Sequence, residues 1–248
     1  MLFEKKKKKK IFAFDLDGTI TQHKSKVEEA NLRMLQELSK RYKVVIVGAG
    51  SCERISKQLY DISLDIIGQY GLEKARFESS GGDEKLTYIE KNVIEIDKQF
   101  FEKQISILRD KYSFNKYDGH SVEFHPSGIV TFPILGTEAK LTDKLNFDPK
   151  REKRRRIYDD VQKYFPGSNV FIGGTSSFDI SPLGYDKFNA LKEYSNENNV
   201  TIDEIVYFGD DYGLGGNDEH VFRSNIDFIK VDSYLNLVGL IESFVKMQ

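Results

Sequence analysis

The stretch IFAFDLDGTIT, residues 11–21, decides the fold. Its first four residues form a short continuous hydrophobic run, which is typical of a strand buried on both faces of a parallel sheet. Asp15 and Asp17 follow at once, and Gly18 then allows the chain to turn sharply. Side chains alternate along a strand, so aspartates at positions 15 and 17 point to the same side. The stretch therefore predicts paired carboxylates at the carboxyl end of a buried strand.

Three further apolar runs have the same character and are bounded by polar or glycine residues: KVVIVGAG (43–50), EIVYFGDD (204–211) and IDFIKVD (226–232). A helical pattern with leucines at 32, 35 and 38 separates the first two strands. Strand, helix and strand in succession predict an α/β fold with a doubly wound parallel sheet. Ligands of such sheets bind outside the carboxyl ends of the strands, where Asp15, Ser51 and Asp210 fall.

The middle of the chain has a different pattern. Alternating, hairpin-like runs replace the solid apolar strands, and HPSG (125–128) predicts a turn between two of them. Two amphipathic helices are expected, one over 96–112 and one from Asp148–Pro149 to Tyr164. We therefore predict a catalytic core from 1–80 and 186–248 with an inserted α+β cap domain, residues 81–185.

Composition excludes several classes of function. The 37 Lys and Arg against 39 Asp and Glu give a net charge of −2, so the whole chain offers no general field for nucleic acid or an anionic membrane. Cys52 is the only cysteine, which excludes an internal disulfide and fits a reducing compartment. No apolar stretch approaches the ~20 residues of a membrane span. The early lysines precede a strand rather than the apolar segment of a secretion signal, so we expect a cytoplasmic protein.

Two basic runs are interpreted as solvated surface. Lys5–Lys10 would be an N-terminal arm that keeps a near-neutral chain soluble, the alternative being a polyanion site. Lys150–Arg156 would be a helix surface paired with Asp159 and Asp160. Because six cations in seven positions cover every face of a helix, the alternative is that some of them point into a cleft.

The paired aspartates suit phosphoryl transfer. A carboxylate can attack phosphorus only if its own charge is tolerated and the phosphate is made electrophilic. Mg²⁺ does both, because it prefers carboxylate and carbonyl oxygens and keeps phosphate oxygens as further ligands. One aspartate can then attack while the other donates a proton to the leaving oxygen, provided that their surroundings separate their pKa values.

A hydrophobic strand followed by DLDGT resembles the first motif of the haloacid dehalogenase (HAD) superfamily of phosphotransferases. The resemblance implies that Asp15 becomes an aspartyl phosphate and that Asp17 is the general acid and base. Either Ser51 or Gly50 takes the place of the hydroxyl residue that holds a phosphate oxygen, and Lys187 in GYDKFNAL matches the lysine that neutralises charge. The implied Mg²⁺ ligands are Asp15, Asp17, Asp210 and Asp211, with Asn217 and Asp218 in the same acidic stretch.

The strings IGGTSSFDISPLGYDKFNAL (172–191) and YFGDDYGLGGNDEHVF (207–222) are similar to the eukaryotic-type phosphomannomutase branch of that superfamily. In that branch the serine and aspartate of SFD reach the bound sugar, which implies that Ser177 and Asp179 bind a phosphorylated sugar here. The alternative is that they cap a strand end. The resemblance also implies a homodimer formed through the cap, although the apolar strands there could equally serve the cap's own core.

The resemblance fails in one segment. A phosphohexomutase must hold a second phosphate, which calls for bidentate arginines, and the branch carries them in the segment that corresponds to 123–141. This chain has His125, Thr137, and Lys140 or Leu141 at those places. We therefore expect a sugar-phosphate phosphatase whose cap selects the sugar through Ser177, Asp179 and His125. The mutase remains an alternative if arginines of 150–156 rebuild the clamp, and a catalytically idle binding protein is a third.

Overall fold

The computed structural model describes residues 8–80 and 83–247, and its contacts divide the chain into two units. The core unit comprises the residues up to Lys91, Lys187–Tyr212 and the residues from His220 on. The cap unit comprises Asn92–Asp186 and Gly213–Glu219. The boundary thus falls about ten residues later than residue 81, because the hairpin that ends at Lys91 pairs with the core sheet.

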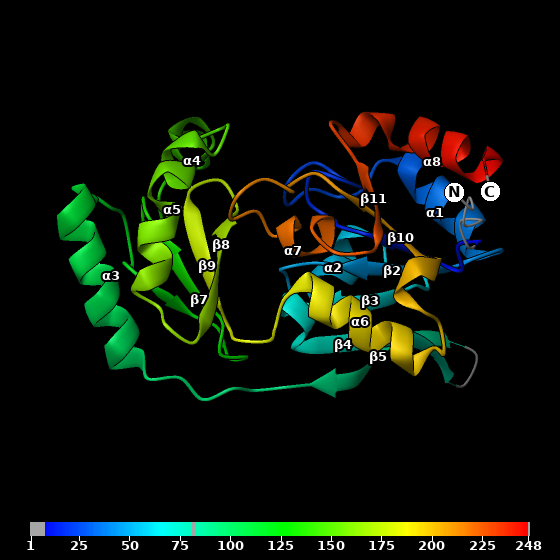
Figure 1. The fold of residues 1–248 in the computed structure, drawn as a ribbon, viewed down its shortest axis with the longest axis horizontal. Helices are drawn as coiled ribbons and strands as arrows, with labels where there is room; N and C mark the ends of the chain where they lie inside the picture. The colour runs from blue at the N-terminus through cyan, green and yellow to red at the C-terminus, as the bar shows by residue number, and fades with distance from the viewer. Residues whose placement is uncertain (1–7, 81–82, 248) are drawn as a thin grey trace, which may run out of the picture. The chain divides into compact units, whose positions relative to one another are not determined.

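The core unit is built on a seven-stranded sheet (Figure 1). The four predicted strands are present and lie parallel beside one another with β3, and the antiparallel hairpin β4–β5 extends the sheet at one edge. In sheet order the strands are β11 (Asp227–Lys230), β10 (Ile205–Gly209), β1 (Ile11–Phe14), β2 (Lys43–Val47), β3 (Asp65–Gly68), β4 (Glu73–Ser80) and β5 (Asp83–Lys91). The doubly wound α/β core is confirmed.

Both faces of the core sheet are buried, which explains the solid apolar runs. Phe12 and Phe14 face a hydrophobic cluster that includes α1 (Glu29–Ser39) and α8 (Leu237–Lys246). Ile11 and Ala13 face a second cluster with α6 (Lys187–Glu197) on the opposite side, and Figure 1 shows these helices on the two faces. The core helices α2 (Cys52–Gln58) and α7 (Glu219–Phe222) are short. Alternate strand residues therefore enter different clusters, and each strand is apolar throughout.

The cap unit pairs a four-stranded antiparallel sheet with helices (Figure 1). The strands, in sheet order, are β6 (Glu123–Phe124), β7 (Val130–Pro133), β9 (Ser177–Pro182) and β8 (Ser168–Gly173). The helices are α3 (Lys98–Tyr112), α4 (Leu141–Phe147) and α5 (Glu152–Lys163). Apolar side chains such as Val130 and Phe132 pack with α3 and α5 in one cluster, so the apolar strands do serve the cap's own core.

The predicted cap elements differ from the structure in detail. HPSG is a turn, in which the Gly128 amide donates to the carbonyl of His125. The second predicted helix begins at Glu152 rather than at Pro149, and the unpredicted α4 precedes it. Asp148 still caps the start of α5, because its carboxylate accepts from the amides of Lys153 and Arg154.

The N-terminal lysine run is only partly described, since Lys5–Lys7 lie outside the described residues. Lys9 is not solvated: it is buried, forms an ion pair of 3.0 Å with Asp227 and donates to the carbonyl of Asp203. Lys10 pairs with Glu204 at 2.7 Å. The interpretation as a solvated arm is therefore wrong for Lys9, which ties the start of β1 to the neighbouring edge of the sheet. Among the described helices, none is both long and apolar enough to cross a membrane.

Candidate active site

Asp15 follows the last residue of β1 directly, at the carboxyl edge of the core sheet. Its amide donates to the carbonyl of Phe208, the residue of β10 that pairs with Phe14, and this bond fixes the backbone there. The side chain is buried, and the ammonium of Lys187, the first residue of α6, lies 2.5 Å from its Oδ1. Lys187 is itself fully buried. The structure thus brings together two predicted catalytic residues as a buried ion pair, in which the lysine offsets the carboxylate's charge.

Asp210 follows β10 and lies next to the turn after Asp15. The Thr19 hydroxyl donates from Oγ1 to Asp210 Oδ1 at 3.2 Å. Gly18 has φ +103°, and a Cβ there would lie 2.7 Å from the Asp210 carboxyl group. Only glycine fits this place, both by its conformation and by the close approach of the carboxylate.

The carboxylates of Asp15 and Asp210 fit a divalent cation. Each offers an oxygen within 4.8 Å of the other's, close enough for one ion to bind both. Carboxylate oxygens are the ligands that Mg²⁺ prefers. Asp211 is the next residue along the chain and is buried in the core unit. Asp218 belongs to residues 213–219, which group with the cap unit.

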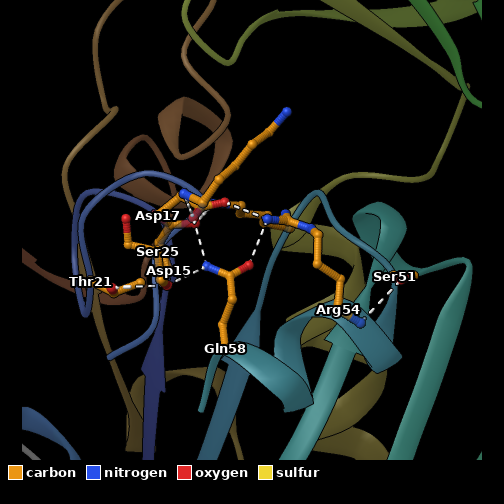
Figure 2. Close-up of polar contacts among 9 residues, drawn as sticks. Asp15, Asp17, Thr21, Ser25, Ser51, Arg54 and Gln58 are labelled. Atoms are coloured by element: carbon orange, nitrogen blue, oxygen red, sulfur yellow. Dashed lines mark hydrogen bonds and ion pairs between the residues drawn. The ribbon is translucent and has the colours of Figure 1, made fainter. Parts of the chain in front are cut away.

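The Asp17 side chain makes contacts that the sequence analysis did not predict (Figure 2). Its carboxylate accepts from Arg54 Nη1 at 3.1 Å, Gln58 Nε2 at 3.1 Å and the Lys24 amide at 2.7 Å. Burial alone would raise the pKa of Asp17. The charges of Arg54 and His23, together with the hydrogen bonds from the Lys24 amide and Gln58, outweigh burial and lower that pKa. Asp17 is therefore ionised at neutral pH in this arrangement, which suits a general base.

Arg54 and Gln58 lie on one face of α2, and Ser51 caps the same helix. They follow Ser51 by three and seven residues, a spacing that places side chains on the same side of a helix. The Ser51 hydroxyl oxygen accepts from the Arg54 amide at 3.2 Å, so its own proton remains available for a phosphate oxygen. This spacing was the signal in the sequence from which both residues could have been found.

Other residues brace the loop that carries Ser51. Gln69 and Tyr70 adopt left-handed conformations after β3, with φ of 48° and 58°, and the Gln69 amide donates to the Gly50 carbonyl at 2.8 Å. Strained residues of this kind cluster at functional sites. Cys52, next to Ser51, is no nucleophile, because burial, together with the nearby charge of Glu73, raises its pKa to about 12.

The polar face of the cap sheet joins His125, Thr131 and Asp179 in a chain of hydrogen bonds. Thr131 donates from Oγ1 to Asp179 Oδ1 at 3.0 Å, and His125 Nε2 lies 3.1 Å from the same Oγ1. Because the hydroxyl proton is used on Asp179, Nε2 of His125 is the donor to Thr131. Ser177, also on β9, bonds to the Gly173 carbonyl at 3.1 Å. Two of the three predicted sugar-binding residues, Ser177 and Asp179, therefore lie on β9, and Thr131 links Asp179 to His125, the residue after β6.

The interpretation of the basic run as solvated surface is wrong for Arg154, whereas Lys150, Lys153 and Arg156 are exposed. Arg154 is 1% exposed, its Nε pairs with Asp148 at 3.0 Å, and its Nη1 donates to the carbonyls of Gly173 and Ser177. Asp160 pairs with Lys111 and Tyr112 of α3 instead of with this run. The buried guanidinium thus organises the turn between β8 and β9, directly before the SFD residues.

A second buried cap arginine is also committed to the backbone. Arg109 donates to four carbonyls, those of Phe114, Ser121, Pro133 and Ile134. Because both Nη atoms of Arg109 already donate to carbonyls, this guanidinium cannot bind a phosphate through two parallel hydrogen bonds. Arg109 and Arg154 therefore do not supply the guanidinium pairs that are missing at His125, Thr137 and the position of Lys140 or Leu141.

Comparisons with known proteins identify the family of the chain. The family model of haloacid dehalogenase-like hydrolases matches residues 12–222. A phosphomannomutase of Encephalitozoon cuniculi is 27% identical, covering 94% of this chain and 96% of its own, and human phosphomannomutase 1 is 26% identical, covering 88% and 85%. The IMP-nucleotidase of Plasmodium falciparum shares the fold at 13% identity, with a TM-score of 0.71 over 97% of this chain and 71% of that chain.

These matches bear out the resemblance inferred from DLDGT and from the SFD and GGND stretches. They also exclude the idle binding protein, since both the family and the curated relatives are enzymes. With a family model that spans most of its length, the chain is an enzyme that belongs to the haloacid dehalogenase-like hydrolases.

Proposed function

We propose that the protein is a Mg²⁺-dependent phosphatase of phosphorylated sugars that acts through an aspartyl phosphate on Asp15. The observation that carries the proposal is the buried Asp15–Lys187 ion pair with the Asp210 carboxylate beside it. Asp15, Asp210 and the backbone carbonyl of Asp17 would hold the ion, with Asp211 or Asp218 as a further carboxylate. Mg²⁺ bound there would withdraw charge from the phosphate oxygens and offset the charge of the attacking carboxylate.

In the first half-reaction a carboxylate oxygen of Asp15 forms a bond to phosphorus, and the bond from phosphorus to the sugar oxygen breaks. Asp17 gives that oxygen a proton, and the sugar alcohol leaves. Since the contacts with Arg54 and Gln58 favour ionised Asp17, the protonated form must make other contacts at this step. In the second half-reaction Asp17 takes a proton from water, which attacks phosphorus and releases inorganic phosphate. Lys187 stabilises the charge on Asp15 and the transferring group throughout.

The cap unit would recognise the sugar part of the substrate. Asp179 and Ser177 can bind hydroxyl groups, and the link through Thr131 fixes His125 with its Nδ1 as an acceptor when the ring is neutral. A phosphatase needs no second phosphate clamp, which agrees with the commitment of Arg109 and Arg154 to backbone carbonyls. We also propose that the enzyme works in the cytoplasm and that any homodimer forms through the cap.

The second candidate is a phosphomannomutase that interconverts hexose 6-phosphate and hexose 1-phosphate, and the names of the curated relatives favour it. Phosphate release from mannose 6-phosphate, mannose 1-phosphate and glucose 6-phosphate with Mg²⁺ separates the two. A parallel mutase assay would be primed with a hexose 1,6-bisphosphate. Free phosphate without isomerisation supports the phosphatase, whereas efficient isomerisation with little free phosphate supports the mutase.

A further inference from the structure

A basic pocket lies beside Asp17 in the core unit. It has a volume of about 510 Å³ and is formed by the loop after β1 and the helix α2. Four cations and one carboxylate are among its lining residues, which are Lys24, Lys26, Ser51, Glu53, Arg54, Lys57 and Gln58. The reaction described above involves the contacts of Arg54 and Gln58 with Asp17, and it gives the pocket itself no role.

Two of the four cations are already engaged. Lys57 forms an ion pair with Glu53 at 2.5 Å, one turn earlier on α2. Lys26 donates to the carbonyl of Lys57 and lies 4.7 Å from the ring centre of Tyr60. Arg54 and Lys24 remain as the cations that could bind a ligand.

Arg54 lines the pocket, and one edge of its guanidinium lies against Gly50. Its Nη1 is shared between Asp17 and Gln58, at 3.1 and 2.7 Å (Figure 2). Among the residues that the structure describes, none accepts from Nε or Nη2. A Cβ on Gly50 would lie 2.2 Å from both of these nitrogens, so the glycine makes the room in which this edge of Arg54 sits. Two parallel N–H groups in this geometry match two oxygens of a phosphate.

Lys24 is held at the pocket in a conformation that lysine seldom adopts. Its φ is +57°, and its amide donates to Asp17 at 2.7 Å. Non-glycine residues in the left-handed region persist where their surroundings fix them, and they cluster at ligand sites. Within the described part of the chain, the Lys24 ammonium has no acceptor. Asp17 therefore fixes both cations, Lys24 through its backbone and Arg54 through its side chain.

We propose that this pocket is an anion subsite in which Arg54 and Lys24 bind a phosphate group other than the one that Asp15 attacks. The inference rests on the proposed function, since it takes Asp15 as the attacking group. Arg54 would then supply from the core unit a guanidinium of the kind that phosphohexomutases carry in the cap, at the positions of His125 and Thr137 here. The bound phosphate is either the second phosphate of a bisphosphorylated sugar or a separate phosphate ion.

The test compares hydrolysis of glucose 1,6-bisphosphate with that of glucose 6-phosphate. We expect kcat/KM of the wild type to be at least about tenfold higher for the bisphosphate, because a hydrogen bond to a charged group usually contributes binding free energy of that size. Arg54→Gln and Lys24→Gln should each lower this preference about tenfold. The ratio isolates the subsite, because any effect of Arg54 on Asp17 acts on both substrates. The control is Arg33→Gln, an exposed arginine of α1 paired with Glu29, which should keep the wild-type ratio.

Calorimetric titration with glucose 1,6-bisphosphate in the absence of Mg²⁺ measures the same subsite without turnover. Arg54→Gln and Lys24→Gln should weaken binding about tenfold. Wild-type affinity and a wild-type ratio in both variants would overturn the inference. An enzyme that hydrolyses neither substrate would contradict the proposed function alone, and the calorimetric comparison would still decide on the subsite.

Inorganic phosphate distinguishes the two sources of the anion. If it stimulates glucose 6-phosphate hydrolysis in the wild type and not in Arg54→Gln, a separate phosphate ion occupies the subsite. If it only inhibits, and the preference for the bisphosphate depends on Arg54, the substrate's own second phosphate is the occupant.

Discussion

The ammonium of Lys187 lies 2.5 Å from Oδ1 of Asp15, although 172 positions separate the two residues in the chain. Lys187→Gln removes the charge that offsets the nucleophile and the transferring phosphate. We expect kcat/KM for phosphate release to fall at least about a hundredfold, the size seen when a group that stabilises developing charge is lost. Lys192→Gln, an exposed lysine of the same helix, is the control and should stay within about twofold of the wild type.

We expect Arg154 to contribute to the free energy of unfolding rather than to catalysis. Arg154→Met leaves the buried Asp148 carboxylate and the carbonyls of Gly173 and Ser177 without their donor. The free energy of unfolding, measured with urea, should fall by about 3–5 kcal/mol. Arg156→Met, at an exposed position of the same basic run, should change it by less than about 0.5 kcal/mol. Equal effects of the two substitutions would contradict a structural role for Arg154.

Asp148 should make the stability of the protein depend on pH in the acid range. Burial opposes its charge, but the amides of Lys153 and Arg154 and the Arg154 guanidinium outweigh this and hold the pKa below its ordinary value. A lowered folded pKa means that the unfolded chain takes up the proton first as the pH falls. The stabilisation is therefore complete well above about pH 4 and is lost as the pH falls through the folded pKa.

Urea unfolding of the wild type and Asp148→Asn between about pH 2 and pH 7 measures this effect. The difference in free energy of unfolding between them should be largest near neutral pH and should shrink below about pH 4. A difference that stays constant over the whole range would show that the Asp148 charge does not contribute.

Thr131 should affect sugar recognition through Asp179 and His125. Thr131→Val keeps the shape of the side chain and removes the hydroxyl that joins them. We expect KM for the preferred sugar phosphate to rise about tenfold, because the two partly buried hydrogen bonds that position Asp179 and His125 are lost. Hydrolysis of an aryl phosphate, which carries no sugar hydroxyl groups, should change much less. An equal rise in KM for both substrates would argue against a role in reading the sugar.

The parts of the fold that the sequence predicted well are those with a strong local signal. β1, β2 and β10 are buried on both faces, so their hydrophobic runs are unbroken and end at Asp15, the Ser51 loop and Asp210. β3 was missed because its run, Asp65–Gly68, is too short to stand out. Of the hairpin β4–β5, only β5 was assigned to the cap, because its residues alternate, as those of an edge strand do.

Side-chain partners distant in sequence were harder to predict. In the run 150–156 the pattern could not show which cation is buried, because cations occupy every face of the helix. Only the tertiary fold brings Asp148 and the Gly173 carbonyl to Arg154. Arg54 and Gln58 were missed for a different reason: their spacing from Ser51 was visible, but the direction of the Asp17 side chain was not.

The most direct test of the account is the covalent step on Asp15. Wild-type enzyme with Mg²⁺ and ³²P-labelled glucose 6-phosphate would be quenched in acid within the first turnover and examined for label on the protein. We expect a base-labile label on Asp15 in the wild type, and neither label nor phosphate release with Asp15→Asn. Phosphate release by Asp15→Asn at more than a per cent or so of the wild-type rate would show that Asp15 is not the nucleophile.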